Sequence, residues 1–129
     1  MLGISDLSAY LKQEGHDTIL YDTTNKNNIS IRTEIHDMIN NYGPDLIAMS
    51  CTSMDYSKAI KIAGNIKAAH DVKIIFGGVH PTVDSYGTLS NDCVDMICVG
   101  EGELAVSKLL NAMENKKNYS NIPSIWIKK

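Results

Sequence analysis

An apolar run ends abruptly in two glycines, a histidine and a proline in the stretch Lys73-Ile74-Ile75-Phe76-Gly77-Gly78-Val79-His80-Pro81-Thr82. A second ending of this kind follows at Met96-Ile97-Cys98-Val99-Gly100-Glu101-Gly102-Glu103. Continuous apolar runs of strand length are typical of parallel strands buried on both faces. Ligands of open parallel sheets bind outside the carboxyl ends of the strands, where glycines let backbone amides approach them closely. The two endings therefore predict a sheet edge that holds a flat or extended cofactor.

Helical and extended patterns alternate along the chain. Strands are predicted at residues 18–22, 45–50, 73–76 and 95–99, and an alternating pattern at 124–128 predicts an edge strand. Apolar residues three and four apart predict helices near 4–11, 31–42, 56–66 and 103–114. Gly15 ends the first helix and Gly43-Pro44 ends the second. This alternation predicts a doubly wound α/β fold, flavodoxin-like or Rossmann-like, with a parallel sheet and right-handed crossovers.

The first strand of such a fold is missing, because the chain opens with a helix. In the flavodoxin-like order that strand lies in the middle of the sheet. Without it, the strand at 18–22 must pair directly with the strand at 45–50 or stay unpaired. We expect that Met1 is not the natural start or that a longer parent protein has been trimmed. An unpaired strand edge would also offer a surface for homodimerisation.

Length and composition indicate one globular domain over residues 1–129. The chain is 43% hydrophobic and 21% charged, with a net charge of −3. No basic cluster suits nucleic acid, no apolar run approaches the roughly 20 residues of a membrane span, and no signal-peptide pattern is present. We therefore expect a cytoplasmic protein that binds neither nucleic acid nor membrane. Its three cysteines lack the spacing of a metal or iron–sulfur site and are expected to be structural.

The predicted strand ends carry hydroxyls and glycines and little charge. Because parallel strands end at the same edge of a sheet, we expect these residues to lie side by side there. They are Asp22, Thr23, Thr24, Ser50, Thr52, Ser53, Gly77, Gly78, His80, Gly100, Glu101 and Gly102. Hydroxyls and bare amides suit amide groups and a single phosphate. A di- or triphosphate would call for a GxxxxGK[ST] or GxGxxG motif, and neither follows a strand here.

Structural explanations exist for the same residues. The hydroxyls at 50–53, or Asp55, would cap the next helix, and Gly77-Gly78 would serve a tight turn. His80 precedes a proline, which favours an extended backbone, and a hydrogen bond that stabilises its loop is its simplest role. Glu101 and Glu103 suit a helix N-terminus through the helix dipole. His36 and His70 are expected to face solvent.

The paired motifs carry a resemblance to a known family. The stretch Gly77-Gly78-Val79-His80-Pro81-Thr82, followed by Val94-Asp95-Met96-Ile97-Cys98-Val99-Gly100-Glu101-Gly102-Glu103, resembles the N-terminal cobalamin (vitamin B12)-binding domain of cobalamin-dependent radical S-adenosylmethionine (SAM) enzymes. The pattern from Leu2 to His16, the ending Tyr21-Asp22 and the run from Pro44 to Ser50 are similar to the same family. The resemblance thus covers nearly the whole chain, and GGxHPT and GEGE in this order are specific together.

The resemblance implies a flavodoxin-like domain whose strand ends cradle the corrin ring and admit its nucleotide tail. By this analogy Ser50, Thr52 and Ser53 line the tail cavity, and Gly77 and Gly78 pass close to the nucleotide. Val79 and His80 border the same pocket, with Gly100, Glu101 and Gly102 across from them, and Asp22 ends a neighbouring strand. The DxHxxG motif, whose histidine ligates cobalt in other cobalamin domains, is absent. We expect His80 to line the tail pocket without ligating cobalt.

The resemblance also implies that this chain is not catalytic alone. The three-cysteine motif and the barrel domain of the radical enzymes are missing. A radical SAM domain, in cis or in trans, would add a [4Fe-4S] cluster and SAM for methyl transfer or ring-forming chemistry. Two alternatives remain. One is a receiver-type signalling or interaction domain, although its acidic cluster and lysine are not visible. The other is a degenerate family member that keeps the shape and binds no cofactor.

Overall fold

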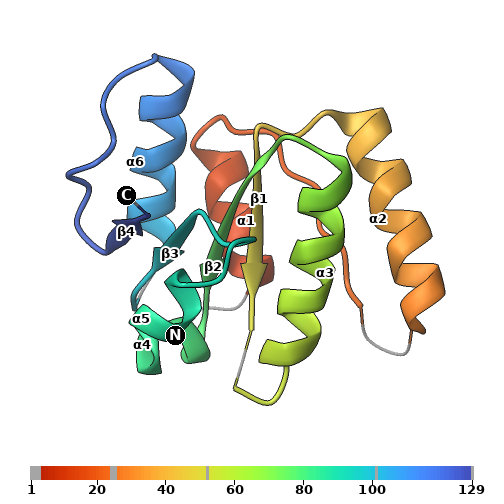
Figure 1. Ribbon diagram of the computed structural model, residues 1–129. Coiled ribbons are helices and arrows are strands. Elements are labelled where there is room, and N and C mark those ends of the chain that lie inside the picture. The colour runs from red at the N-terminus through yellow and green to blue at the C-terminus, as the bar shows by residue number, and fades with distance from the viewer. Residues whose placement is uncertain (1–3, 24–25, 52, 101, 129) are drawn as a thin grey trace.

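The sheet at the centre of the protein is mixed, with a parallel part and one antiparallel edge strand (Figure 1). The computed structural model describes residues 4–23, 26–51, 53–100 and 102–128. Its strands are β1 (Leu46–Ser50), β2 (Lys73–Gly77), β3 (Met96–Cys98) and β4 (Ile125–Ile127), in the order β1-β2-β3-β4. β1, β2 and β3 are parallel, and β4 runs antiparallel to β3. The structure confirms the predicted α/β class and the predicted C-terminal edge strand.

Helices cover both faces of this sheet (Figure 1). The longer ones are α1 (Ile4–Gln13), α2 (Asn28–Tyr42), α3 (Tyr56–Ala69) and α6 (Glu103–Glu114). Two short helices, α4 (Val79–Val83) and α5 (Ser85–Leu89), follow β2. Ile74 and Phe76 pack toward α3, whereas Ile75 packs toward α6. Because neighbouring strand residues point to opposite faces, an unbroken apolar run such as β2 fills both cores at once.

Local chemistry sets the ends of the helices. At the start of α2, the side chain of Asn27 accepts a hydrogen bond from the backbone N–H of Ser30 at 2.8 Å. At its end, Gly43 has φ +66° and donates its N–H to the carbonyl of Ile39. This left-handed glycine followed by Pro44 is a helix stop, as predicted.

A half-buried ion pair fixes the start of β2 and the entry to β3. Lys67 Nζ lies 2.7 Å from Asp95 Oδ2, and the same oxygen accepts the backbone N–H of Ile74 at 2.8 Å. The backbone N–H of Asp95 in turn donates a hydrogen bond to the carbonyl of Ile74 at 3.0 Å. These contacts hold β2 and β3 in register, so that their carboxyl ends finish together.

The prediction of a strand at residues 18–22 was wrong. This segment has no regular secondary structure, and Ile19 and Leu20 are about half exposed. It is held by side chains, because Ser8 Oγ and Thr18 Oγ1 lie 2.6 Å apart and the Tyr21 hydroxyl donates to Glu34 on α2. A strand needs a backbone partner, and within the described residues β1 pairs with β2 alone.

The region after β2 also differs from expectation. His80 was predicted to be extended because Pro81 follows it, but both residues lie in the first turn of α4. A proline fits there because the first N–H groups of a helix have no intrahelical acceptor. α5, which begins after the N-cap residue Asp84, was not predicted either.

The histidines at 36 and 70 do not simply face solvent. Each is half-buried, and His36 Nδ1 lies 2.7 Å from His70 Nε2 in a hydrogen bond between α2 and the end of α3. Their rings stack with centroids 4.9 Å apart. All three cysteines are buried and free, as expected of structural cysteines. Among the described residues, no helix has the length and apolar character needed to cross a membrane.

Candidate functional site

The loops that follow β1 and β2 are tied together by their backbones. Ser50 pairs with Gly77 in the sheet, and the N–H of Cys51 donates to the carbonyl of Gly77 at 3.1 Å. The N–H of His80 then donates to the carbonyl of Cys51 at 3.2 Å. The carboxyl ends of the two strands therefore form one continuous surface, as the sequence predicted.

Gly78 is required by the fold itself. Its backbone has φ +101° and ψ −162°, a region that residues with a side chain avoid. A Cβ atom there would lie 2.8 Å from the carbonyl oxygen of Cys51 and 3.0 Å from Ser50 Oγ. The tight-turn explanation therefore accounts for Gly78 without any ligand.

Gly77 and Gly102 are different, because their described surroundings do not demand a glycine. Neither has a positive φ. A Cβ on Gly77 would meet Cys98 Cβ at 3.9 Å, and a Cβ on Gly102 would meet Cys98 Sγ at 3.7 Å, both ordinary contacts. At Gly100, φ is +85° and the space where a Cβ would lie is open. These three glycines leave bare backbone at the strand ends, which is what close approach of a ligand needs.

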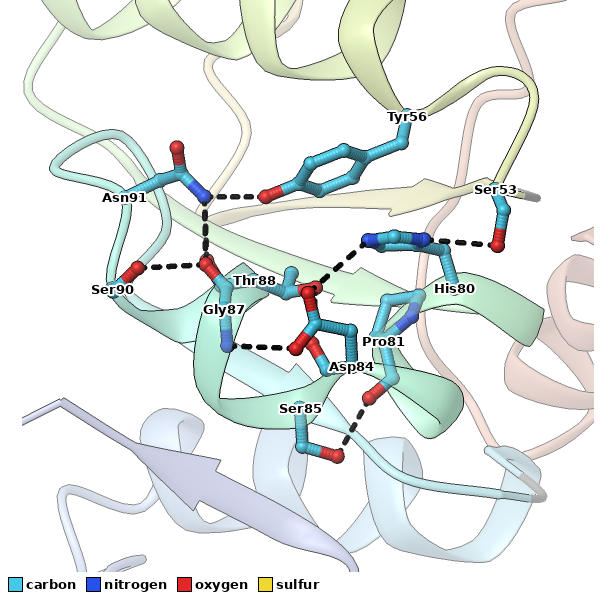
Figure 2. A network of polar contacts seen from close by, with 10 residues as sticks. All are labelled: Ser53, Tyr56, His80, Pro81, Asp84, Ser85, Gly87, Thr88, Ser90 and Asn91. Atoms are coloured by element: carbon cyan, nitrogen blue, oxygen red, sulfur yellow. Dashed lines mark hydrogen bonds and ion pairs between the residues drawn. The ribbon is translucent and has the colours of Figure 1, made fainter.

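His80 joins α4 to the start of α3 (Figure 2). Its Nδ1 lies 3.0 Å from Ser53 Oγ, and its ring stacks on Tyr56 with centroids 3.9 Å apart. The Tyr56 hydroxyl in turn accepts a hydrogen bond from Asn91 Nδ2 at 2.5 Å. His80 thus has the loop-stabilising role that was its simplest interpretation. Ser53 bonds to His80, while the N-cap of α3 is Asp55, whose side chain makes no capping hydrogen bond.

The other ring nitrogen of His80 points toward Asp84 (Figure 2). Nε2 is buried and lies 3.9 Å from Asp84 Oδ2, and among the described residues it has no hydrogen-bond partner. A second buried polar atom, Glu103 Oε1 in the first turn of α6, also has no hydrogen-bond partner in the part of the chain that the structure describes. Buried polar atoms are almost always hydrogen-bonded in folded proteins. Two such atoms in the elements that follow β2 and β3 are therefore features that a ligand would explain.

Thr82 was quoted within the GGxHPT motif but was not predicted to be a site residue. Its hydroxyl donates to the carbonyl of Gly78 at 3.1 Å and accepts the N–H of Gly100 at 2.9 Å. A hydrogen bond from a threonine hydroxyl to the carbonyl four residues earlier is common in helices. The contact with Gly100 crosses between two strand-end loops, so no local sequence pattern could have revealed it.

The thiols at this edge are unreactive. Cys51 is 3% exposed, and burial, with a smaller contribution from the charge of Asp55, raises the pKa of its thiol to about 11. Burial and the nearby Glu103 carboxylate also raise the pKa of the Cys98 thiol. Since the thiolate is the nucleophile and the metal ligand, neither cysteine suits such chemistry near neutral pH. Within the described part of the chain, His, Cys, Asp and Glu form no group of three that could hold a metal ion.

Most of the predicted site residues gather at this edge. The bonds and register above bring together Ser50, Ser53, Gly77, Gly78, His80 and Gly100, with Gly102 at the N-cap of α6. Asp22 is exposed and lies in the irregular segment after α1, outside the sheet. Thr24, Thr52 and Glu101 lie outside the described residues, and so does the side chain of Val79.

The family follows from comparison with known proteins. A family model described as "B12 binding domain" matches residues 1–110. The chain belongs to this family. This B12-binding domain is also similar to parts of cobalamin-dependent radical SAM methyltransferases, which confirms the predicted family.

The relatives are much longer proteins. An uncharacterized methyltransferase of Pyrococcus horikoshii is 27% identical over 125 residues, which are 94% of this chain and 26% of the relative. The cobalamin-dependent radical SAM methyltransferase TokK of Streptomyces tokunonensis is 28% identical over 67% of this chain and 13% of its own length. The B12-binding domain thus spans about a quarter or less of these relatives.

Solved structures show the same fold. Two structures of the radical SAM methyltransferase TsrM from Kitasatospora setae superpose with a TM-score of 0.84 at 17% identity. The alignments cover 92% of this chain and 24% or 23% of the TsrM chain. One contains tryptophan and a SAM analogue, and the other contains cobalamin and a [4Fe-4S] cluster. At this identity the likeness supports the Rossmann-like fold and the predicted α/β class.

Proposed function

We propose that this B12-binding domain binds cobalamin at the carboxyl edge of β1, β2 and β3 and serves as the cobalamin module of a larger radical SAM methyltransferase. The observation that carries the proposal is the bare backbone at Gly77, Gly100 and Gly102. In the described surroundings, Gly77 and Gly102 have room for a Cβ and no positive φ, and the Cβ position of Gly100 is open. A ligand that packs against the strand ends explains why Gly77 and Gly102 are glycine, whereas the φ of +85° already favours glycine at Gly100.

The polar groups at this edge fit the chemistry of cobalamin. The nucleotide tail carries one phosphate, and the corrin ring carries many amides, so hydroxyls and backbone amides suffice and a P-loop is not needed. Ser50 and Ser53 supply exposed hydroxyls, and the buried Glu103 Oε1 is an acceptor that no described residue supplies with a donor. An amide N–H₂ of the ring would satisfy that acceptor. Bound cobalamin would supply a cobalt centre that carries a methyl group, and this chain's residues would bind and orient it.

Exposed apolar side chains follow each of the three parallel strands. Met54 after β1 is 95% exposed, Val83 on α4 is 74% exposed, and Leu104 on α6 is 59% exposed. Large apolar side chains left exposed after the strand ends suit a surface that a ligand or another domain covers. We propose that the corrin ring and a radical SAM domain, joined in cis or in trans, cover these side chains. That domain would add the [4Fe-4S] cluster and SAM.

Methyl transfer is the chemistry that we propose for the whole enzyme, in preference to ring formation, because the relatives reported above are named methyltransferases. The net charge of −3 argues against nucleic acid as a partner. Three free cysteines, buried as thiols, favour a reducing compartment such as the cytoplasm.

We also propose that the outer edge of β1 lets two copies associate. Among the described residues β1 pairs only with β2, and Ala48 in its centre is exposed. An open strand edge presents unpaired backbone groups to another chain. Size-exclusion chromatography with light scattering should show a dimer that Ala48→Lys converts to a monomer. A monomer at all concentrations would refute this association and would leave the proposal of cobalamin binding unaffected.

Titration of the purified chain with hydroxocobalamin tests the main proposal. We expect saturable binding, a change in the visible spectrum of the cobalamin, and co-elution of colour with protein in gel filtration. A chain that folds, as judged by circular dichroism, and yet binds no cobalamin at high micromolar concentration would refute the proposal. That result would favour a degenerate family member that keeps only the shape.

A further inference from the structure

We propose that Thr82 is a positioning residue that joins the two glycine loops of the site and makes the B12-binding domain selective for corrinoids with a nucleotide tail. This inference rests on the proposed function, because it names how the same edge recognises its ligand. Thr82 lies in α4, one turn after Gly78, and it belongs to the motif GGxHPT. Its partner Gly100 begins the motif GEGE.

The hydrogen-bonding roles of the Thr82 hydroxyl are unambiguous. A hydroxyl has one proton to donate and two lone pairs that accept. Because the carbonyl of Gly78 only accepts, the Thr82 proton points to it across 3.1 Å. Because the N–H of Gly100 only donates, it uses a lone pair of the same oxygen at 2.9 Å. One side-chain oxygen therefore bridges the backbones of the loops that follow β2 and β3.

This bridge ties together two glycines with left-handed backbones. Gly78 has φ +101° and Gly100 has φ +85°, and glycine has more backbone freedom to lose than any other residue. On the other side of α4, the N–H of His80 bonds to Cys51 and its ring bonds to Ser53. The short helix α4 thus holds all three strand-end loops in place, and Thr82 provides the link to the third.

The link should matter most for the nucleotide tail. Thr82 is exposed, so water competes with its hydrogen bonds in the free protein and their contribution to stability is small there. A tail that enters between the two glycine loops would exclude that water and would need the loops already in place. The corrin ring would lie outside the strand ends and would not depend on the spacing between the loops.

Two substitutions separate the hydroxyl from the shape of the side chain. Thr82→Val keeps the branched shape and removes the hydroxyl, whereas Thr82→Ser keeps the hydroxyl. The ligands are cobalamin and cobinamide, which has the corrin ring and lacks the nucleotide tail. We expect Thr82→Val to bind cobalamin about tenfold more weakly, since 1.4 kcal/mol corresponds to a factor of ten. Thr82→Ser should bind it like the wild type, and all three proteins should bind cobinamide equally.

A second measurement tests the bridge without any ligand. Amide hydrogen exchange, followed by NMR, should show faster exchange at Gly100 in Thr82→Val than in the wild type or in Thr82→Ser. Thr82→Ala serves as a second variant without the hydroxyl if the valine variant does not fold. Unchanged exchange at Gly100 would overturn the bridge.

The binding data distinguish the two levels of the proposal. If the wild type binds cobalamin and Thr82→Val binds it equally well, the positioning role is refuted and the proposed function stands. If Thr82→Val loses affinity for cobalamin and cobinamide alike, the selectivity for the tail is refuted. If the wild type binds neither corrinoid, both the proposed function and this inference are refuted.

Discussion

Replacing Gly78 with alanine should destabilise the B12-binding domain severely, even in the absence of cobalamin. The backbone at φ +101° and ψ −162° is almost restricted to glycine, and a side chain there costs about 1–3 kcal/mol. The new methyl group would also lie 2.8 Å from the carbonyl oxygen of Cys51, and overpacking of this kind costs about 1–3 kcal/mol more. The sum, about 2–6 kcal/mol, is a large part of the 5–15 kcal/mol that stabilises a typical domain.

Urea unfolding followed by circular dichroism measures this loss directly. Gly77→Ala is the matched control, because its Cβ would meet only Cys98 Cβ at 3.9 Å and its φ is not positive. We expect the control to unfold close to the wild-type midpoint and Gly78→Ala to unfold at a much lower urea concentration, with similar slopes. If Gly78→Ala stays within about 1 kcal/mol of the wild type, then this backbone is not strained and the reasoning from its geometry is wrong.

Three further predictions follow from single residues. Gly77→Ala should leave stability nearly unchanged and weaken cobalamin about tenfold by isothermal titration calorimetry, and equal affinity would show that no ligand approaches this backbone. Asp95→Ala should cost about 2–3 kcal/mol in urea unfolding, because it removes the acceptor of the Ile74 N–H and the counter-charge of Lys67, whose ammonium keeps only the Val72 carbonyl among the described groups. The Cys51 thiol, with its pKa raised from 9.0 to about 11, should resist iodoacetamide at pH 8 until urea unfolds the chain. Because the unfolded thiol ionises first, its contribution to stability should be lost between pH 9 and 11, and a Cys51→Ala variant should lack that part of the pH dependence.

Local patterns in the sequence were enough to predict most of the elements. Burial imposes a sequence period on each element separately. A short stretch of sequence was therefore enough to predict the apolar runs of β1, β2 and β3 and the apolar stripes of α2, α3 and α6. The glycine endings after β2 and β3 were found in the same way. Since parallel strands end at a common edge, these endings also predict the candidate site at that edge.

Elements that depend on distant partners were predicted poorly. Residues 18–22 have the composition of a strand. However, β propensity reflects how side chains pack against neighbouring strands more than an intrinsic preference of the backbone. α4 holds His80 and Pro81 in its first turn, and α4 and α5 are each only five residues long. Helices this short are unstable alone. Here they are held by contacts such as His80 with Tyr56, which no local pattern contains.

The sequence alone therefore determined the fold class, the family and the edge proposed to bind the ligand, because these depend on periodicity and on motifs that are contiguous in the chain. Only the tertiary structure decided what each residue at that edge does. It showed that Gly78 serves the turn, that His80 bonds to Ser53 across 27 positions, and that Thr82 reaches Gly100 across 18. Hydrogen bonds between loops depend on how the strands and helices pack, and that packing follows from the whole chain.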